Sequence, residues 1–122
     1  MPMRQKTVAV VDDDPSVLKA IERLLAAHRF QVVVSPSAEA FLANASSKDA
    51  DCLVLDIHLD KMSGFELRRQ LADCGWTIPI IFITAFDDER TYQEALKAGC
   101  IDYLRKPFPS RLLLAAIEKA LR

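Results

Sequence analysis

Short, wholly apolar runs that each end in a polar side chain place the strongest constraint on how this chain can fold. These runs cover residues 8–11, 52–55 and 80–83, and they end at Asp12, Asp56 and Thr84. A run of this length and composition is typical of a strand buried on both faces of a parallel sheet. An ionised carboxylate cannot lie unpaired inside such a strand. We therefore expect Asp56 at the end of its strand, at a polar mouth of the sheet.

Helix signals separate the apolar runs and make strands and helices alternate. We expect strands at residues 7–11, 30–34, 52–56, 80–84 and 102–105, with a polar loop at 46–51. Helix starts are predicted at Asp14-Pro15, at Ser37, near residue 65, at Asp87 or Asp88, and at Ser110. Strict alternation predicts an α/β fold with a doubly wound, five-stranded parallel sheet covered by helices on both faces. In such a sheet, ligands bind outside the carboxyl ends of the strands.

Composition narrows the class of protein. The 122 residues suffice for one domain, which we expect to span residues 1–122. The net charge of −1 shows no basic excess, so this domain is not expected to bind nucleic acid. No apolar run reaches the length of a membrane span. The three cysteines are widely spaced and predict reduced thiols, which favours the cytoplasm.

The polar residues at the strand ends predict a phosphoryl-transfer site. If the first and third strands are neighbours, Asp12, Asp13 and Asp56 converge and repel one another. A hard divalent cation such as Mg²⁺ relieves that repulsion, and an aspartate can accept a phosphoryl group. Lys106 supplies a cation and Thr84 a hydroxyl donor, both after later strands. Each residue alone is weak evidence, but the set favours this chemistry.

The sequence as a whole resembles the receiver domain of two-component response regulators. The matching segments are Val11-Asp12-Asp13, Asp56, Met62-Ser63-Gly64, Thr84-Ala85, Ala98-Gly99 and Tyr103 through Phe108. They cover essentially the whole chain in the family's order and spacing. The resemblance implies a flavodoxin-like (βα)5 fold with strand order 2-1-3-4-5, an order that general accounts of this family also give.

The resemblance also implies a role for each site residue. Asp56 receives a phosphoryl group from the phosphohistidine of a sensor histidine kinase or a phosphotransfer protein. Mg²⁺ is held by Asp13, Asp56 and the His58 backbone carbonyl, and by Asp12 through water. Lys106 and Thr84 contact the phosphoryl group, and Thr84 and Tyr103 form the switch.

Further expectations concern the surroundings of the site. The Lys106–Pro107 peptide bond is expected to be cis. The fourth helix, fifth strand and fifth helix form the readout face. A homodimer on phosphorylation is left open, and the effector or target is not identified by the sequence.

Three positions depart from the family pattern or vary within it. Asp60 stands where a proline is common, which predicts a less rigid and more acidic loop after Asp56. His58 and Phe86 take variable positions that the resemblance places at the mouth of the site. We expect the bulky Phe86 to slow hydrolysis of the aspartyl phosphate.

Two other classes of protein remain as alternatives. A receiver-like scaffold would bind partners without phosphorylation. This alternative is disfavoured because this chain keeps all five residues of the predicted phosphoryl-transfer site, namely Asp12, Asp13, Asp56, Thr84 and Lys106. A Mg²⁺-dependent phosphohydrolase would also form an aspartyl phosphate, but it typically needs a carboxylate where this chain has His58. We therefore predict a phosphoacceptor signalling domain rather than an enzyme that turns over a metabolite.

Overall fold

The computed structural model describes residues 5–86 and 88–122. Its strands are β1 (Thr7–Val11), β2 (Gln31–Ser35), β3 (Cys52–Asp56), β4 (Ile80–Thr84) and β5 (Asp102–Arg105). Its helices are α1 (Pro15–Ala27), α2 (Ala38–Ala43), α3 (Gly64–Asp73), α4 (Glu89–Lys97) and α5 (Ser110–Ala120), with a 3₁₀ turn at Ala45–Asp49. Strands and helices alternate along the chain, as the apolar runs predict.

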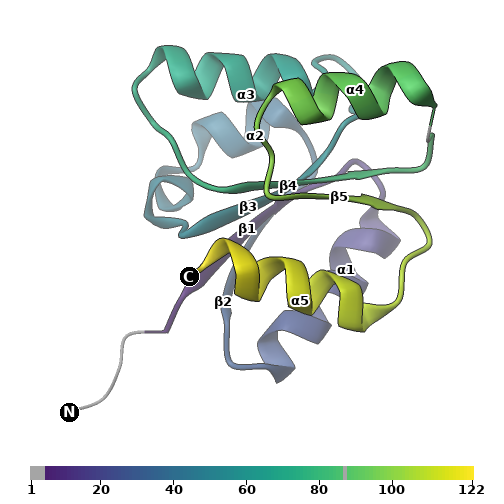
Figure 1. The fold of residues 1–122 in the computed structure, drawn as a ribbon. Helices are drawn as coiled ribbons and strands as arrows, with labels where there is room; N and C mark the ends of the chain where they lie inside the picture. Colours follow the sequence, from purple (N-terminus) through teal and green to yellow (C-terminus); the bar gives the residue numbers. More distant parts are fainter. Residues whose placement is uncertain (1–4, 87) are drawn as a thin grey trace.

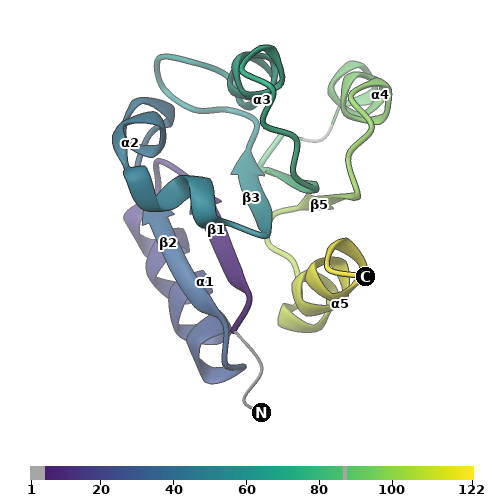
Figure 2. The same cartoon turned by 90° about the vertical axis from the view of Figure 1, so that its left-hand side faces the viewer.

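The five strands form one parallel sheet in the order β2-β1-β3-β4-β5. Figure 1 shows α2, α3 and α4 on one face of the sheet and α1 and α5 on the other, and Figure 2 shows the same layers from the side. The strand order reverses direction between β1 and β3, which are neighbours. This arrangement confirms the doubly wound α/β fold and the predicted order 2-1-3-4-5.

Two hydrophobic clusters, one on each face of the sheet, hold the helices in place. Alternate residues of the same strand serve opposite faces: Val10 packs on the α1–α5 side, whereas Val11 packs on the α2–α4 side. All five residues of β1, β3 and β4 are buried. Nearly all residues of these strands are apolar because both faces of the sheet are covered. The residues that follow the carboxyl ends of these strands are therefore attached to the packed core of the domain.

The residues that cap the helices are the predicted ones, with one exception. Asp14 caps α1 by accepting from the Ser16 N–H, Ser37 caps α2 and Asp88 caps α4; Asp87 lies outside the described residues. The predicted Ser110 cap is wrong: Pro109 occupies the cap of α5 without a side-chain hydrogen bond. The extended backbone of Pro109 (φ −64°, ψ 143°) already starts the helix, so Ser110 is its first helical residue.

Two further boundaries differ slightly from the sequence prediction. The second strand lies one residue later than predicted, because Gln31 and Ser35 pair with Thr7 and Val11. Most of the predicted loop at 46–51 is the 3₁₀ turn, in which the Ser47 hydroxyl donates to the Phe41 carbonyl. Within the described ranges, no helix is long and apolar enough to cross a membrane.

Candidate functional site

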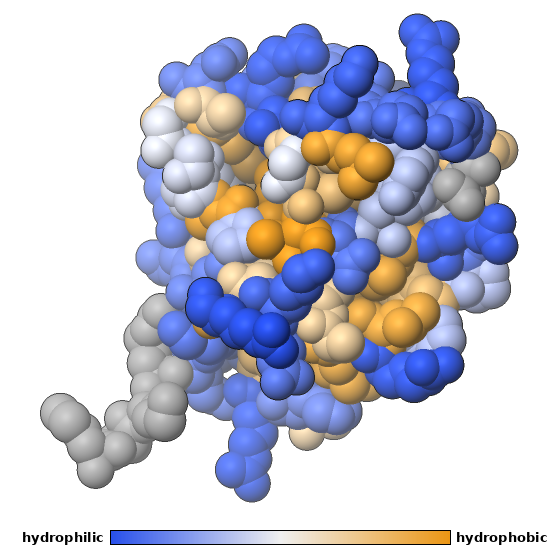
Figure 3. All heavy atoms as spheres, in the orientation of Figure 1, coloured by the Kyte–Doolittle hydropathy of each residue, from blue (hydrophilic) through white to orange (hydrophobic). Residues whose placement is uncertain are grey.

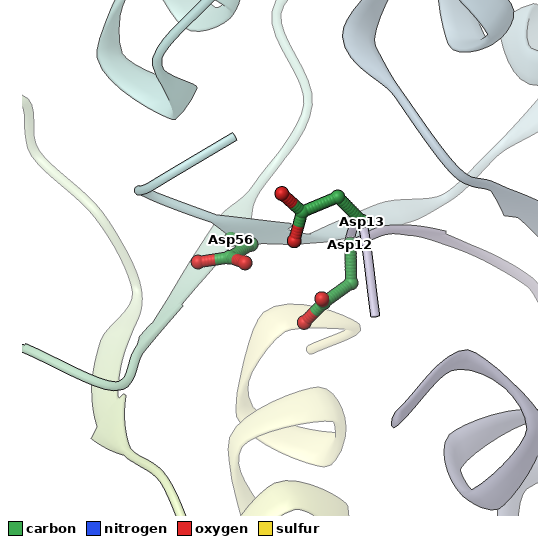
Figure 4. A group of neighbouring side chains, drawn as sticks. All are labelled: Asp12, Asp13 and Asp56. Carbon is green, nitrogen blue, oxygen red and sulfur yellow. The ribbon is translucent and has the colours of Figure 1, made fainter. Parts of the chain in front are cut away.

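Three aspartates meet where β1 and β3 end. Asp12 and Asp13 follow β1, and Asp56 is the last residue of β3. One ligand oxygen from each carboxylate lies within 4.8 Å of the other two. Figure 4 shows the three side chains gathered around one space. Asp12 and Asp56 are buried, whereas Asp13 is exposed. The cluster is therefore closed to solvent on one side and open to it on the other.

Lys106 is the counter-charge of the two buried carboxylates. Its Nζ lies 2.6 Å from Oδ2 of Asp12 and 3.4 Å from Oδ2 of Asp56. The backbone N–H of Lys106 donates to the backbone carbonyl of Thr84 (2.7 Å). This bond holds the start of the β5–α5 loop against the end of β4. The Lys106–Pro107 peptide bond is cis, as expected. The structure thus brings together four of the residues predicted for the site.

The electrostatics of Asp56 are set mainly by burial. Burial raises the pKa of Asp56 to about 6, and the charge of Asp12 adds to the rise. The Lys106 ammonium and the His58 N–H, which donates to Oδ1 of Asp56 (3.1 Å), act in the opposite direction. Burial by itself lowers the pKa of Lys106, but Asp12 and Asp56 outweigh it and the net shift is upward. One ammonium therefore does not fully compensate two buried carboxylates.

The residues present fit a hard divalent cation. Oδ2 of Asp12 is buried. Within the described part of the chain, it forms an ion pair with Lys106 but no hydrogen bond of good geometry. Oδ1 of Asp12 accepts from the Asp14 N–H (2.9 Å), which orients the carboxylate. Carboxylate oxygens are the donors that Mg²⁺ prefers, and it binds through one or two of them with waters completing its shell. The cluster offers such oxygens, with one open side for water.

The Thr84 side chain is buried and bonded away from the aspartates. Its hydroxyl donates to the Phe86 carbonyl (2.9 Å) and accepts from the Phe86 N–H (3.0 Å). The start of the loop after β4, up to Phe86, is therefore held against the end of β4. This bond was not predicted from the sequence, because it needs a turn of the backbone after β4 in addition to the hydroxyl of Thr84.

His58 and Tyr103 take positions compatible with their predicted roles. The His58 N–H contacts Asp56, while the metal-ligand role of the His58 carbonyl stays a prediction. The His58 ring lies edge-on to Phe86, with centroids 5.3 Å apart. Tyr103 is half-buried on β5 and packs edge-on against Tyr92 of α4, with centroids 5.3 Å apart. Its switching role likewise stays a prediction.

Gly64 is a site residue whose role the sequence alone did not reveal. A Cβ at this position would lie 2.5 Å from the Asp56 carbonyl oxygen and 3.0 Å from Cα of Ile57. The Gly64 N–H donates to the Ile57 carbonyl (2.8 Å). The first turn of α3 therefore rests directly on the backbone of Asp56. The motif Met62-Ser63-Gly64 was the only sequence signal for this contact.

Gly64→Ala is expected to lower the free energy of unfolding by about 1–3 kcal/mol, because the contact is with backbone that cannot rotate away. Urea unfolding measures this loss. Gly75→Asn is the matched control: Gly75 has a positive φ that Asn tolerates, and nothing lies within 4 Å of its Cβ position. Equal losses in both variants would contradict the role given to Gly64.

The comparison with known families gives a match over most of the chain. Residues 8–118 match the family model described as "Response regulator receiver domain". The response regulator protein TmoT of Ectopseudomonas mendocina is 40% identical over 119 residues, which cover 98% of this chain and 54% of TmoT. The chain thus spans about half the length of the curated relatives it matches.

Solved structures agree with this match. FixJ-N is 40% identical with a TM-score of 0.85, and the alignment covers 98% of this chain and 95% of that one. The BeF3-activated N-terminal receiver domain of Klebsiella pneumoniae RstA is 32% identical with a TM-score of 0.86, covering 96% and 99% of the two chains.

Proposed function

The chain belongs to the response regulator receiver family, and on that premise we propose that it is a phosphoacceptor switch whose acceptor is Asp56. The observation that carries the proposal is the cluster of Asp12, Asp13 and Asp56 with Lys106 on the buried side. A sensor histidine kinase or a phosphotransfer protein is the proposed donor, through its phosphohistidine. We also propose that residues 1–122 form a single receiver domain.

In this proposal each residue has a distinct part in the transfer. Oδ of Asp56 attacks the phosphorus atom, and the P–N bond to the donor imidazole breaks as the acyl phosphate forms. Lys106 stays close to Asp56 and neutralises charge on the incoming phosphoryl oxygens. The Thr84 hydroxyl leaves the Phe86 carbonyl and donates to a phosphoryl oxygen.

A Mg²⁺ ion is the proposed cofactor, held by Asp13, Asp56 and the His58 carbonyl, and by Asp12 through water. When bound, it neutralises charge shared by the carboxylates and the phosphoryl oxygens. The raised pKa of Asp56 supports this requirement, since the buried carboxylate is under-compensated without further positive charge.

The proposed readout face is formed by α4, β5 and α5. Tyr92 and Leu96 of α4 and Leu112 of α5 are exposed although they are large and apolar. From the side drawn in Figure 3, apolar side chains reach the surface in a band between α4 and α5, below the largely hydrophilic outer surface of α3 and α4. Inward rotation of Tyr103, which now contacts Tyr92, would alter this band and so report phosphorylation to an effector, a target protein or a second copy of the chain. A cytoplasmic location remains a prediction.

Intact-mass measurement tests the proposed function. The chain is incubated with acetyl phosphate and Mg²⁺, beside an EDTA control and the Asp56→Asn variant. We expect one phosphoryl adduct on the native chain and none in either control. An adduct on Asp56→Asn would move the acceptor elsewhere, and the absence of any adduct on native chain that binds Mg²⁺ would favour the scaffold alternative.

Phe86→Ala is expected to shorten the lifetime of the aspartyl phosphate several-fold. Phe86 is 66% exposed at the loop beside Thr84, so its ring can shield the acyl phosphate from water without being part of the core. The measurement is loss of the phosphoryl adduct with time after removal of the donor. Leu42→Ala, which removes a 43% exposed side chain on α2, is the control; an unchanged lifetime in Phe86→Ala would refute the shielding role.

A further inference from the structure

The His58–Phe86 contact joins the two loops that flank the acceptor. His58 belongs to the loop after β3 and Phe86 to the loop after β4. Their rings meet edge to face, at 5.3 Å and an interplanar angle of 80°. Both side chains are exposed, Phe86 to 66%, so the pair is not explained by core packing. An exposed aromatic pair that bridges two loops needs another account.

The backbone of each ring residue is bonded to a residue of the site. The His58 N–H donates to Oδ1 of Asp56 at 3.1 Å. The Phe86 carbonyl and N–H hold the Thr84 hydroxyl at 2.9 and 3.0 Å. The ring pair thus closes a path from Asp56 through His58 and Phe86 to Thr84. This path connects the Thr84 hydroxyl to the ring contact.

The proposed transfer requires the Thr84 hydroxyl to give up its donor bond to the Phe86 carbonyl. Because a hydroxyl has one hydrogen to donate, it cannot bond a phosphoryl oxygen and the Phe86 carbonyl at once. Loss of this bond frees the Phe86 backbone, and a displacement of that backbone would separate the Phe86 ring from His58. The contact therefore favours the arrangement in which Thr84 is turned away from Asp56.

We propose that the His58–Phe86 ring pair is a latch that holds Phe86 in the position seen here and opposes the movement of Thr84 toward a phosphoryl group on Asp56. This inference rests on the proposed function, because it concerns the same switch. Edge-to-face aromatic pairs are strong enough to shift a two-state equilibrium by about 2- to 10-fold. The latch is thus a positioning device that sets how readily the site switches.

The test uses beryllofluoride with Mg²⁺, a phosphoryl mimic that is not hydrolysed, so that shielding from water plays no part. His58→Ala, Phe86→Ala and the double variant all keep the backbone bonds to Asp56 and Thr84. Their apparent affinities for beryllofluoride are measured by titration, and the Thr84 methyl resonance reports the position of that side chain. Leu42→Ala is the control for loss of an exposed apolar side chain.

We expect each single variant to bind beryllofluoride about 2- to 10-fold more tightly, and the double variant to gain no more than either one. Independent, multiplying effects would overturn the latch, because they would show that the rings do not act through each other. Unchanged or weaker binding in the single variants would also overturn it. If the native chain binds Mg²⁺ but neither binds beryllofluoride nor forms a phosphoryl adduct, the proposed function itself is wrong.

Discussion

Asp56→Asn is expected to raise the free energy of unfolding by about 2–3 kcal/mol near neutral pH in the absence of divalent cations. Burial and the neighbouring Asp12 raise the pKa of Asp56 to about 6, from an ordinary value near 4 in the unfolded chain. Between these two values the folded state binds the proton more tightly than the unfolded state. The stability of the native chain is therefore lost as the pH rises through this window. Asparagine has nearly the same shape and carries no charge to bury.

Urea unfolding at about pH 7.5 and about pH 4.5, in EDTA, measures this effect. The difference between the native chain and Asp56→Asn should be large at the higher pH and small at the lower pH, where Asp56 is already mostly protonated in the folded state. Added Mg²⁺ should stabilise the native chain more than the variant, since a ligand that binds only the folded state stabilises it. Equal stabilities of the two chains near neutral pH would show that Asp56 is not an uncompensated buried charge.

Lys106→Met is expected to have the opposite effect on stability and to stop phosphoryl transfer. It leaves the buried Asp12 and Asp56 carboxylates facing each other without the ammonium that lies 2.6 and 3.4 Å from them. Removing one partner of a buried ion pair costs about 3–5 kcal/mol, and the 18% exposure of the Lys106 side chain favours the lower end of that range. Methionine keeps an unbranched apolar stem, so the loss reports the charge.

Phosphorylation of Lys106→Met by acetyl phosphate should be at least about 100-fold slower, since one preorganised donor to the reacting oxygens is lost. Lys119→Met, at an exposed position of α5, is the matched control and should change neither property. The Asp56→Asn/Lys106→Met double variant should lose less stability relative to Asp56→Asn than Lys106→Met loses relative to the native chain. Additive losses would mean that Lys106 and Asp56 are not coupled.

The parallel sheet and the meeting of Asp12, Asp13 and Asp56 could be predicted from the sequence, because both depend on patterns along the chain. The strands at Thr7–Val11, Cys52–Asp56 and Ile80–Thr84 agree residue by residue, since buried strands of a parallel sheet have a mostly apolar composition. The convergence of Asp12 and Asp56 followed from placing polar residues at the ends of neighbouring strands.

Contacts between loops could not be predicted in this way. The bonds between Thr84 and the Phe86 backbone depend on a local turn after β4. The ring contact of Phe86 with His58 depends on how two loops far apart in the sequence approach each other. The cap of α5 was mispredicted for a related reason: a serine favours a cap, but the backbone conformation of Pro109 decided where the helix begins. Local preference yields where neighbouring structure fixes the backbone.

The most direct test of the central claim is to locate the phosphoryl group within the chain. The protein is treated with acetyl phosphate and Mg²⁺, and borohydride then reduces any aspartyl phosphate to homoserine, which tandem mass spectrometry assigns to a position. We expect homoserine at position 56 and at no other aspartate. Homoserine at position 12, 13 or 60 with Asp56 unchanged would contradict the account, because the phosphoryl group would then be carried by a different carboxylate.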